Sequence, residues 1–388
     1  MPIINQISSI VNDAVNDALG KSEQITQLDT SSLVSLGKRI GEYNAYEPFF
    51  KSLANRIART VYFVRSYSGS DRHILRDEHD YGAFIQKVYY TMPQATDNPT
   101  YNFSGTNGAF QQASPYDVET TVAVSTMVYG NQGTWTVEII RPVEQIKTAF
   151  TDPASMAAFI DGIYVTVDNA FELELESTVA LADNTAMACA IAGGQARNLL
   201  KEYNDKHSTT LSAVQALENA DFLKYASMEI NRVVDNMSRM STVFNAQGYE
   251  TFTPPDRLVL EMLSQFANAS DMYLQADTFH NELVKLPNFE KVPYWQRAGK
   301  DFAFDDCSTI DVKNTDITKI NESIAGGVVK QAGIIAFVHD IENVAAYFGE
   351  RHSWEIFNPR SDVMVHGEKA RKGFAVDGHA NAVVFYMA

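Results

Sequence analysis

The stretch PASMAAFIDGIYVTVDNAFELELESTVALADNTAMACAIA, residues 153–192, decides the fold that we expect for this chain. Asp152 can cap a helix that begins at Pro153, and the pair Gly193-Gly194 can end it. Apolar residues recur between these signals every three or four positions, as on one helix face: Met156, Ile160, Ile163, Val167, Phe171, Leu175, Val179, Ala182, Ala186 and Cys189. We therefore predict one helix about 60 Å long, at about 1.5 Å per residue.

The opposite side of this predicted helix is acidic. No Lys or Arg occurs between Lys147 and Arg197, whereas carboxylates recur: Asp161, Asp168, Glu172, Glu174, Glu176 and Asp183. Hydrocarbon cannot solvate so many carboxylates, which excludes a membrane span. The helix by itself leaves open whether it is an ordinary core helix with a solvated face. We expect it to bend or break at Gly162 or within the β-branched run 165–167.

The composition is that of an acidic globular protein. Hydrophobic residues make up 45% of the 388 residues and charged residues 20%, which predicts a sizeable core and two or three substructures. The net charge of -17 argues against a nucleic-acid-binding surface, because phosphate contacts need clustered Lys and Arg. We expect neither a secretory signal nor a membrane partner, since no basic leader and no run of 18 apolar residues occurs.

Only two cysteines are present, Cys189 and Cys307, and their spacing matches no metal-binding motif. This predicts two buried thiols in a protein made in a reducing compartment, the cytosol.

The first 59 residues are predicted to be a helical arm. An amphipathic stripe runs from Ile3 to Leu19, and further helical runs cover about Ser31 to Tyr43 and Tyr46 to Arg59. These elements are too short to form a core of their own, so we expect an arm laid over another part of the structure. A plain helical start of the main domain is the alternative.

Residues 60–141 change to a β pattern. Strands are expected at Thr60–Tyr67 and Phe84–Met92, with a long irregular excursion after Pro93. Thr121–Tyr129 and Thr134–Ile140 are predicted to form a hairpin around the Gly130–Gly133 turn.

Aromatic side chains crowd this β region although it has little local core. We predict that a subunit interface buries them, and the candidate residues are Phe84, Tyr89, Tyr90, Tyr101, Phe103, Phe110 and Tyr116. Packing within a β domain of the same chain is an equally open alternative. Base stacking is disfavoured because few Lys and Arg accompany the aromatics.

The rest of the chain mixes helices and strands, which predicts an α+β fold. We expect strands at Ala196–Tyr203, Ala332–His339 and Ala382–Met387, the last one tied into a sheet. The predicted helices are Leu211–Leu217, Asp221–Asn245, Ala269–Leu286 and Ile341–Phe348. Leu258–Phe266 can be either strand or helix, and Asn288–Ile320 is expected to hold loops and short strands.

The sequence contains no motif for catalysis, cofactors or metals. Phosphate-binding loops, G-x-S-x-G and HExxH are absent, so no catalytic, cofactor-binding or metal residue is assigned. His339, Asp340 and His352 could form an acid/base group in an α+β enzyme, although a His at the end of a buried strand is more often structural. The pairs His73/His79 and Asp305/Asp306 are interpreted as exposed turns.

The order of these parts resembles the major capsid proteins of tailed bacteriophages, which have the HK97-type fold. A helical arm, a β excursion, a long spine helix, a mixed α/β lobe and a returning last strand follow one another. Local likeness lies in NRVVDNMSRM at 231–240, TPPDRLVL at 253–260 and HNELVKL at 280–286.

The resemblance implies an arm at 1–59, an extended loop with its supporting strands at 60–141, and an axial domain at 204–348. The peripheral domain would combine 142–203, including the spine helix 153–192, with 349–388.

The same resemblance implies a shell subunit without enzyme activity or cofactor. Copies would form hexamers and pentamers of an icosahedral head around double-stranded DNA, with scaffolding, portal and possible decoration proteins as partners. Assembly would take place in the cytoplasm of the host bacterium, and the mature protein would lie in the virion. The alternatives are the shell of a protein nanocompartment that encloses cargo and, from a different class, the α+β enzyme.

Overall fold

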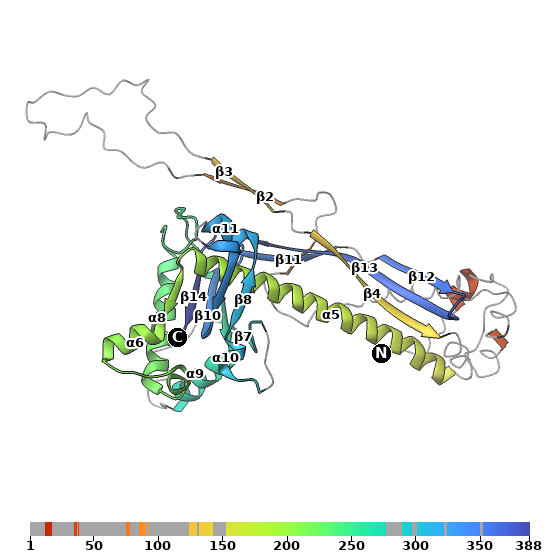
Figure 1. Ribbon diagram of the computed structural model, residues 1–388, viewed down its shortest axis with the longest axis horizontal. Coiled ribbons are helices and arrows are strands. Elements are labelled where there is room, and N and C mark those ends of the chain that lie inside the picture. The colour runs from red at the N-terminus through yellow and green to blue at the C-terminus, as the bar shows by residue number, and fades with distance from the viewer. Residues whose placement is uncertain are drawn as a thin grey trace, which may run out of the picture. The chain divides into compact units, whose positions relative to one another are not determined.

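A computed structural model describes residues 12–17, 35–36, 38, 75–77, 85–90, 92, 124–129, 132–142, 153–276, 289–296, 301–321, 324–349 and 352–388 (Figure 1). The chain divides into two compact units. Unit 1 comprises Met1–Asp80, Asn131–Leu181 and Ala345–Phe374, and unit 2 comprises Tyr81–Gly130, Ala182–Val344 and Ala375–Ala388. The division into arm, loop, peripheral and axial domains stays a prediction.

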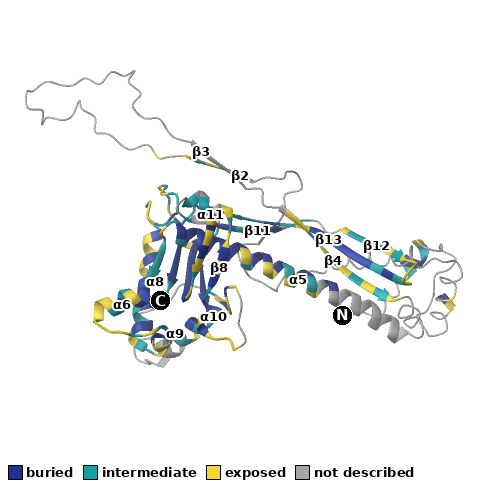
Figure 2. Cartoon of the chain, in the orientation of Figure 1, coloured by how far each residue is buried: buried dark blue, intermediate teal, exposed yellow. Residues whose placement is uncertain are grey.

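The long helix is present with the predicted bounds. Helix α5 spans Pro153–Ala192 as 40 consecutive residues, so the break expected at Gly162 or 165–167 does not occur. The predicted apolar stripe is buried at every described position from Val167 to Cys189. The acidic face was predicted only in part correctly, because Glu172 and Glu176 are exposed whereas Asp183 is buried. From Ala182 to Ala190 the helix is buried all round, which an amphipathic pattern does not predict (Figure 2).

Unit 1 is built on the long strand β13, Val363–Val376. Its neighbours in the described sheet are β12 (His352–Asn358), β4 (Gln132–Pro142) and β11 (Val344–Phe348), and β11 pairs with β1 (Leu75–Asp77). One face of this sheet packs on α5, where Val167, Phe171 and Ala370 form a buried cluster with Trp135 and Ile139. The rings of Trp135 and Phe171 meet edge to face at 4.3 Å between centroids.

Unit 2 contains a sheet whose described strands run in the order β5-β14-β10-β6-β7. They are β5 (Ala196–Asn198), β6 (Leu258–Leu263), β7 (Glu290–Val292), β10 (Ile334–Asp340) and β14 (Ala382–Tyr386). Every residue of β10 is buried, as the apolar run predicted. The last strand is tied into the sheet between β10 and β5, which confirms that prediction.

Helices and small elements complete unit 2. The longer ones are α6 (Leu199–His207), α7 (Ala213–Leu217), α8 (Ala220–Met237) and α9 (Ser264–Ala276). The shorter ones are η3 (Pro255–Arg257), α10 (Phe304–Cys307), β8 (Ile310–Lys313), α11 (Thr315–Ile320), η4 (Ala325–Gly327) and β9 (Val328–Gln331). Helices and strands together confirm the predicted α+β class and resolve 258–266 as a strand followed by the start of a helix.

The predicted hairpin at 121–140 was wrong. Strands form on both sides of the turn, but β3 (Val124–Tyr129) pairs with β2 (Ile85–Tyr90), whereas β4 pairs with β13. A glycine-rich turn is a local signal, and it is outweighed here because all 11 residues of β4 find partners on β13.

Two further assignments were wrong. Residues 344–348 form a strand instead of a helix, because this segment lies between β1, with which 346–348 pair in parallel, and β13. The segment from Ala196 is a strand for only three residues, and helix α6 then replaces the rest of the predicted strand. The Asn198 side chain causes this change by accepting the backbone N–H of Lys201 at 3.0 Å as an N-cap.

The predictions for the cysteines, for membrane spans and for the first 67 residues can be compared with the described part of the chain. Both cysteines are buried and neither forms a disulfide. Within the described residues, no helix combines the length and the apolar character that crossing a bilayer requires. The predicted arm helices and the strand at 60–67 lie outside the described residues, except for helical residues at 12–17, 35–36 and 38.

A buried charged group joins two strands of unit 1. His366 of β13 lies between two carboxylates, with Nδ1 at 3.4 Å from Oε1 of Glu355 and Nε2 at 3.6 Å from Oε1 of Glu368. Burial lowers the pKa of His366, but the hydrogen bonds and negative charges of the two glutamates outweigh burial and raise the pKa to about 9. The imidazolium therefore links β12 and β13 at neutral pH.

We expect His366→Gln to weaken this link in a pH-dependent way. The folded pKa exceeds the ordinary value of 6.5, so the stabilisation is fully present below pH 6.5 and is lost as the pH rises through about 9. Hydrogen exchange of β12 and β13 amides should be roughly tenfold faster in the variant than in the wild type at pH 6, and the difference should shrink toward pH 9.5. His352→Gln, an exposed change on β12, is the control. A pH-independent difference would contradict the charged link.

Candidate functional site

The ribbon formed by β2 and β3 has two unlike faces. The strands are antiparallel, with Ile85 opposite Tyr129 and Tyr90 opposite Val124 (Figure 1). On β2, Lys87 and Tyr89 are partly buried, whereas Val88 is 44% and Tyr90 70% exposed. Side chains alternate along a strand, so one face of β2 is turned to the body of unit 2 and the other is open.

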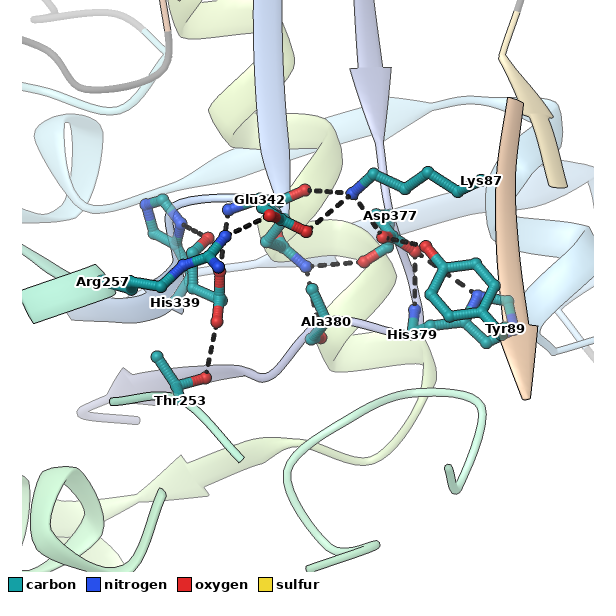
Figure 3. Close-up of polar contacts among 11 residues, drawn as sticks. Lys87, Tyr89, Thr253, Arg257, His339, Glu342, Asp377, His379 and Ala380 are labelled. Atoms are coloured by element: carbon teal, nitrogen blue, oxygen red, sulfur yellow. Dashed lines mark hydrogen bonds and ion pairs between the residues drawn. The ribbon is translucent and has the colours of Figure 1, made fainter. Parts of the chain in front are cut away.

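The inward face of β2 meets the carboxylate of Asp377. The Lys87 ammonium donates to Oδ2 of Asp377 at 2.8 Å, and the Tyr89 hydroxyl donates to the same oxygen (Figure 3). Asp377 directly follows β13, and its side chain is buried. One carboxylate therefore anchors two successive inward residues of the ribbon.

Aromatic stacking adds to this contact. The ring of Tyr89 is stacked on His379, with centroids 4.1 Å apart and planes at 13°. The ring of Tyr249 lies 4.6 Å from His379 in an edge-to-face arrangement and 6.1 Å from the ring of Tyr89. The backbone N–H of His379 also donates to Oδ1 of Asp377 at 3.0 Å, which fixes the carboxylate on its second oxygen.

The loop that carries Asp377 is held by Asn343. The backbone N–H of Asp377 donates to the carbonyl of Asn343 at 2.7 Å, and Nδ2 of Asn343 donates back to the carbonyl of Asp377 at 2.8 Å. Glu342 extends the network because its carbonyl accepts from Lys87 at 3.1 Å and its carboxylate pairs with Arg257 (Figure 3). We call Lys87, Tyr89, Asp377 and His379 the Asp377 latch.

The charge of Asp377 is strongly favoured in the folded chain. Burial by itself raises the pKa of a carboxylate, but the hydrogen bond from His379, the charge of Lys87 and the Tyr89 hydroxyl together lower the pKa of Asp377 well below 3.8. The latch thus contains a permanent ion pair at neutral pH. This arrangement can hold a strand in place.

The predicted interface residues are only partly within the described structure. Tyr89 and Tyr90 lie on β2, one in the latch and the other on the open face. Five lie outside the described residues: Phe84, Tyr101, Phe103, Phe110 and Tyr116. The interface role of all seven stays a prediction.

The residues considered for chemistry have structural surroundings. His339 is fully buried, with Nδ1 at 2.8 Å from the carbonyl of Asp340, and Asp340 accepts from the Thr253 hydroxyl at 2.9 Å. His352 is exposed on β12 and belongs to unit 1, whereas His339 belongs to unit 2. Asp305 and Asp306 are exposed at the start of α10, and His73 and His79 lie outside the described residues.

Among the described residues, no group of three or more His, Cys, Asp or Glu side chains is arranged to hold a metal ion. Sequence reasoning did not find Lys87, Asp377 or His379. The alternation Lys87-Val88-Tyr89-Tyr90 was a usable signal, because it places a cation and a phenol on one strand face. Their partner lies about 290 residues away and could not be identified from spacing.

Comparison with known proteins gives one family and a set of similar folds. The model of the Phi29-like phage major capsid proteins matches residues 9–386. Among curated proteins, no match to the chain was found.

Two solved phage structures have a similar fold. A chain of the capsid of Staphylococcus phage Andhra is 11% identical with a TM-score of 0.52, covering 81% of this chain and 83% of that one. A chain of the bacteriophage P68 structure with head fiber and inner core protein is 12% identical with a TM-score of 0.51 and the same coverage. At this identity the likeness concerns the fold alone.

We expect Asp377→Asn to loosen the ribbon. The lowered pKa means that the ionised carboxylate stabilises the latch above about pH 4 and that this stabilisation disappears as the pH falls further. At pH 7 the variant should exchange the amides of β2 roughly tenfold faster than the wild type, and acidification should bring the two together. Asp305→Asn, an exposed carboxylate in the same unit, is the control. Equal β2 exchange at pH 7 would contradict the latch.

Proposed function

Since the chain belongs to the family of Phi29-like phage major capsid proteins, we propose that its copies form hexamers and pentamers of an icosahedral head around double-stranded DNA. The chain is a major capsid protein and a structural component of a phage virion, which implies a non-enzymatic role. The single observation that carries this conclusion is the family match over residues 9–386.

The β2–β3 ribbon supports a role in subunit contact. The Asp377 latch fixes one face of β2, and Val88 and Tyr90 remain open on the other. Water-exposed apolar residues on a strand face of a self-assembling protein favour burial against another copy. We assign this role to Tyr90 and, from the sequence pattern, to Phe84, Tyr101, Phe103, Phe110 and Tyr116. Tyr89, which the sequence predicted together with them, is engaged in the Asp377 latch.

Four parts of the chain would have different structural roles in assembly. Residues 1–59 would act as an arm, 60–141 as the extended loop with its supporting strands, and 204–348 as an axial domain. Residues 142–203 and 349–388 would form the peripheral domain around α5. The buried stripe and unbroken length of α5 support its role as the spine of that domain.

The charge of the chain suits a container for DNA. A net charge of -17 opposes tight binding to phosphates, so enclosed DNA would remain mobile enough to be packaged and released. We propose scaffolding, portal and decoration proteins as further partners, with assembly in the cytoplasm of the host bacterium. No cofactor is assigned.

A nanocompartment shell is the second candidate, and the contents of purified particles distinguish the two. Nuclease-protected double-stranded DNA in particles from infected cells supports the phage head, whereas an enclosed cargo protein without DNA supports the compartment. The enzyme alternative has less support, because His339 is buried and Asp340 is engaged by Thr253.

We expect the open face of β2 to control shell formation. The double variant Val88→Thr/Tyr90→Ser changes only exposed side chains, so the subunit should fold while closed particles require roughly tenfold more protein or fail to form. Electron microscopy and sedimentation of the expressed chain measure this. Deleting residues 80–116 should leave a folded core without shells.

Tyr294→Ser, at an exposed tyrosine elsewhere in unit 2, serves as the control and should form normal particles. Normal shells from the β2 double variant would refute the contact that we assign to the ribbon.

A further inference from the structure

The sheet of unit 1 has a second face, opposite α5, that carries an apolar row. Ile140 of β4 lies opposite Val365 of β13, and Val365 lies opposite Ile356 of β12. Directly paired residues project to the same side of a sheet, so the three β-branched side chains form one continuous row. Ile140 is 61% and Ile356 56% exposed, which is unusual for aliphatic residues at adjacent positions.

Trp354 extends the row along the strands. It is paired with Gly367, and a Cβ atom at Gly367 would lie 2.2 Å from the Trp354 ring. The indole therefore covers the bare backbone of Gly367 and fills the space beside Val365. We call Ile140, Trp354, Ile356 and Val365 the isoleucine face.

Positive charge borders the isoleucine face at one end. Lys369 and Arg371 follow Val365 and Gly367 at alternate positions of β13, which places them on the same side, and both are exposed. An acidic residue, Glu138, lies opposite Gly367 on the same side of the sheet and is exposed. The border is thus more basic than expected for a chain with a net charge of -17.

We propose that a second copy of this chain covers the isoleucine face in the assembled shell. The inference rests on the proposed function, in which copies pack side by side, and it names a contact surface in unit 1. A second copy provides the complementary chemistry because its net charge is -17, and Lys369 at the border of the apolar centre can meet an anionic group of that copy. Apolar burial supplies the affinity and the basic border orients the contact.

The test compares assembly of wild type with Ile140→Thr/Ile356→Thr. Threonine keeps the β-branched shape that suits a strand, so far-UV circular dichroism and thermal unfolding should remain those of the wild type. The protein concentration at which half of the chain sediments as closed particles should rise about tenfold. Val328→Thr on β9, a similarly exposed strand valine, should leave that concentration unchanged.

Lys369→Glu tests the border independently and keeps the proposal falsifiable if the threonine variant misfolds. It should raise the half-assembly concentration at low salt, and high salt should reduce the difference, because screening weakens exposed charge contacts. Assembly of both variants at the wild-type concentration would overturn the inference. So would normal shells that have lost only an accessory protein, since the occupant would then be that protein. If the wild-type chain forms no shells at all, the proposed function fails instead.

Discussion

Burial of Val167 and Phe171 beneath Ala370 and Trp135 is the constraint on which unit 1 depends. A long helix with one apolar stripe is stable only if a second layer covers that stripe, and here the layer is made by β13 and β4. Burying a side chain of this size contributes about 1.5–3 kcal/mol, so a few such contacts fix the sheet on the helix. The ion pair of Lys372 with Glu174 joins the same two layers. On the other face of the sheet, Ile140 and Ile356 are exposed.

The Asp377 latch stabilises the ribbon formed by β2 and β3. A two-stranded ribbon alone is marginally stable in water, so β2 and β3 need support from a larger body. The latch provides this support through one buried carboxylate that receives Lys87, Tyr89 and His379 at once. Polar anchoring of one face leaves Val88 and Tyr90 exposed on the other face, where we propose the contact with another copy.

Local sequence patterns were sufficient to predict an element where its own residues determine its secondary structure. The bounds of α5, the buried strand β10 and the final strand β14 follow from periodicity, caps and continuous apolar runs. The order of parts also led to the capsid family, which the family match confirms. Local patterns failed where a distant partner decides. Residues 344–348 form a strand that pairs with β1, and β4 pairs with β13 instead of forming the expected hairpin.

The sequence by itself determined the long helix, the α+β class, the acidic character of the chain and its family, because each of these depends on residues close together or on composition. Only the tertiary structure decided which strands pair with one another. It also decided that α5 is buried on all sides from Ala182 to Ala190, including Asp183, and that Lys87 and Tyr89 donate hydrogen bonds to Asp377. The physical reason is that strand pairing and burial depend on residues far away in the sequence. The hydrophobic periodicity of a segment does not indicate which distant segment it will contact. The helix at 153–192 is visible in the sequence, whereas the layers that it supports are not.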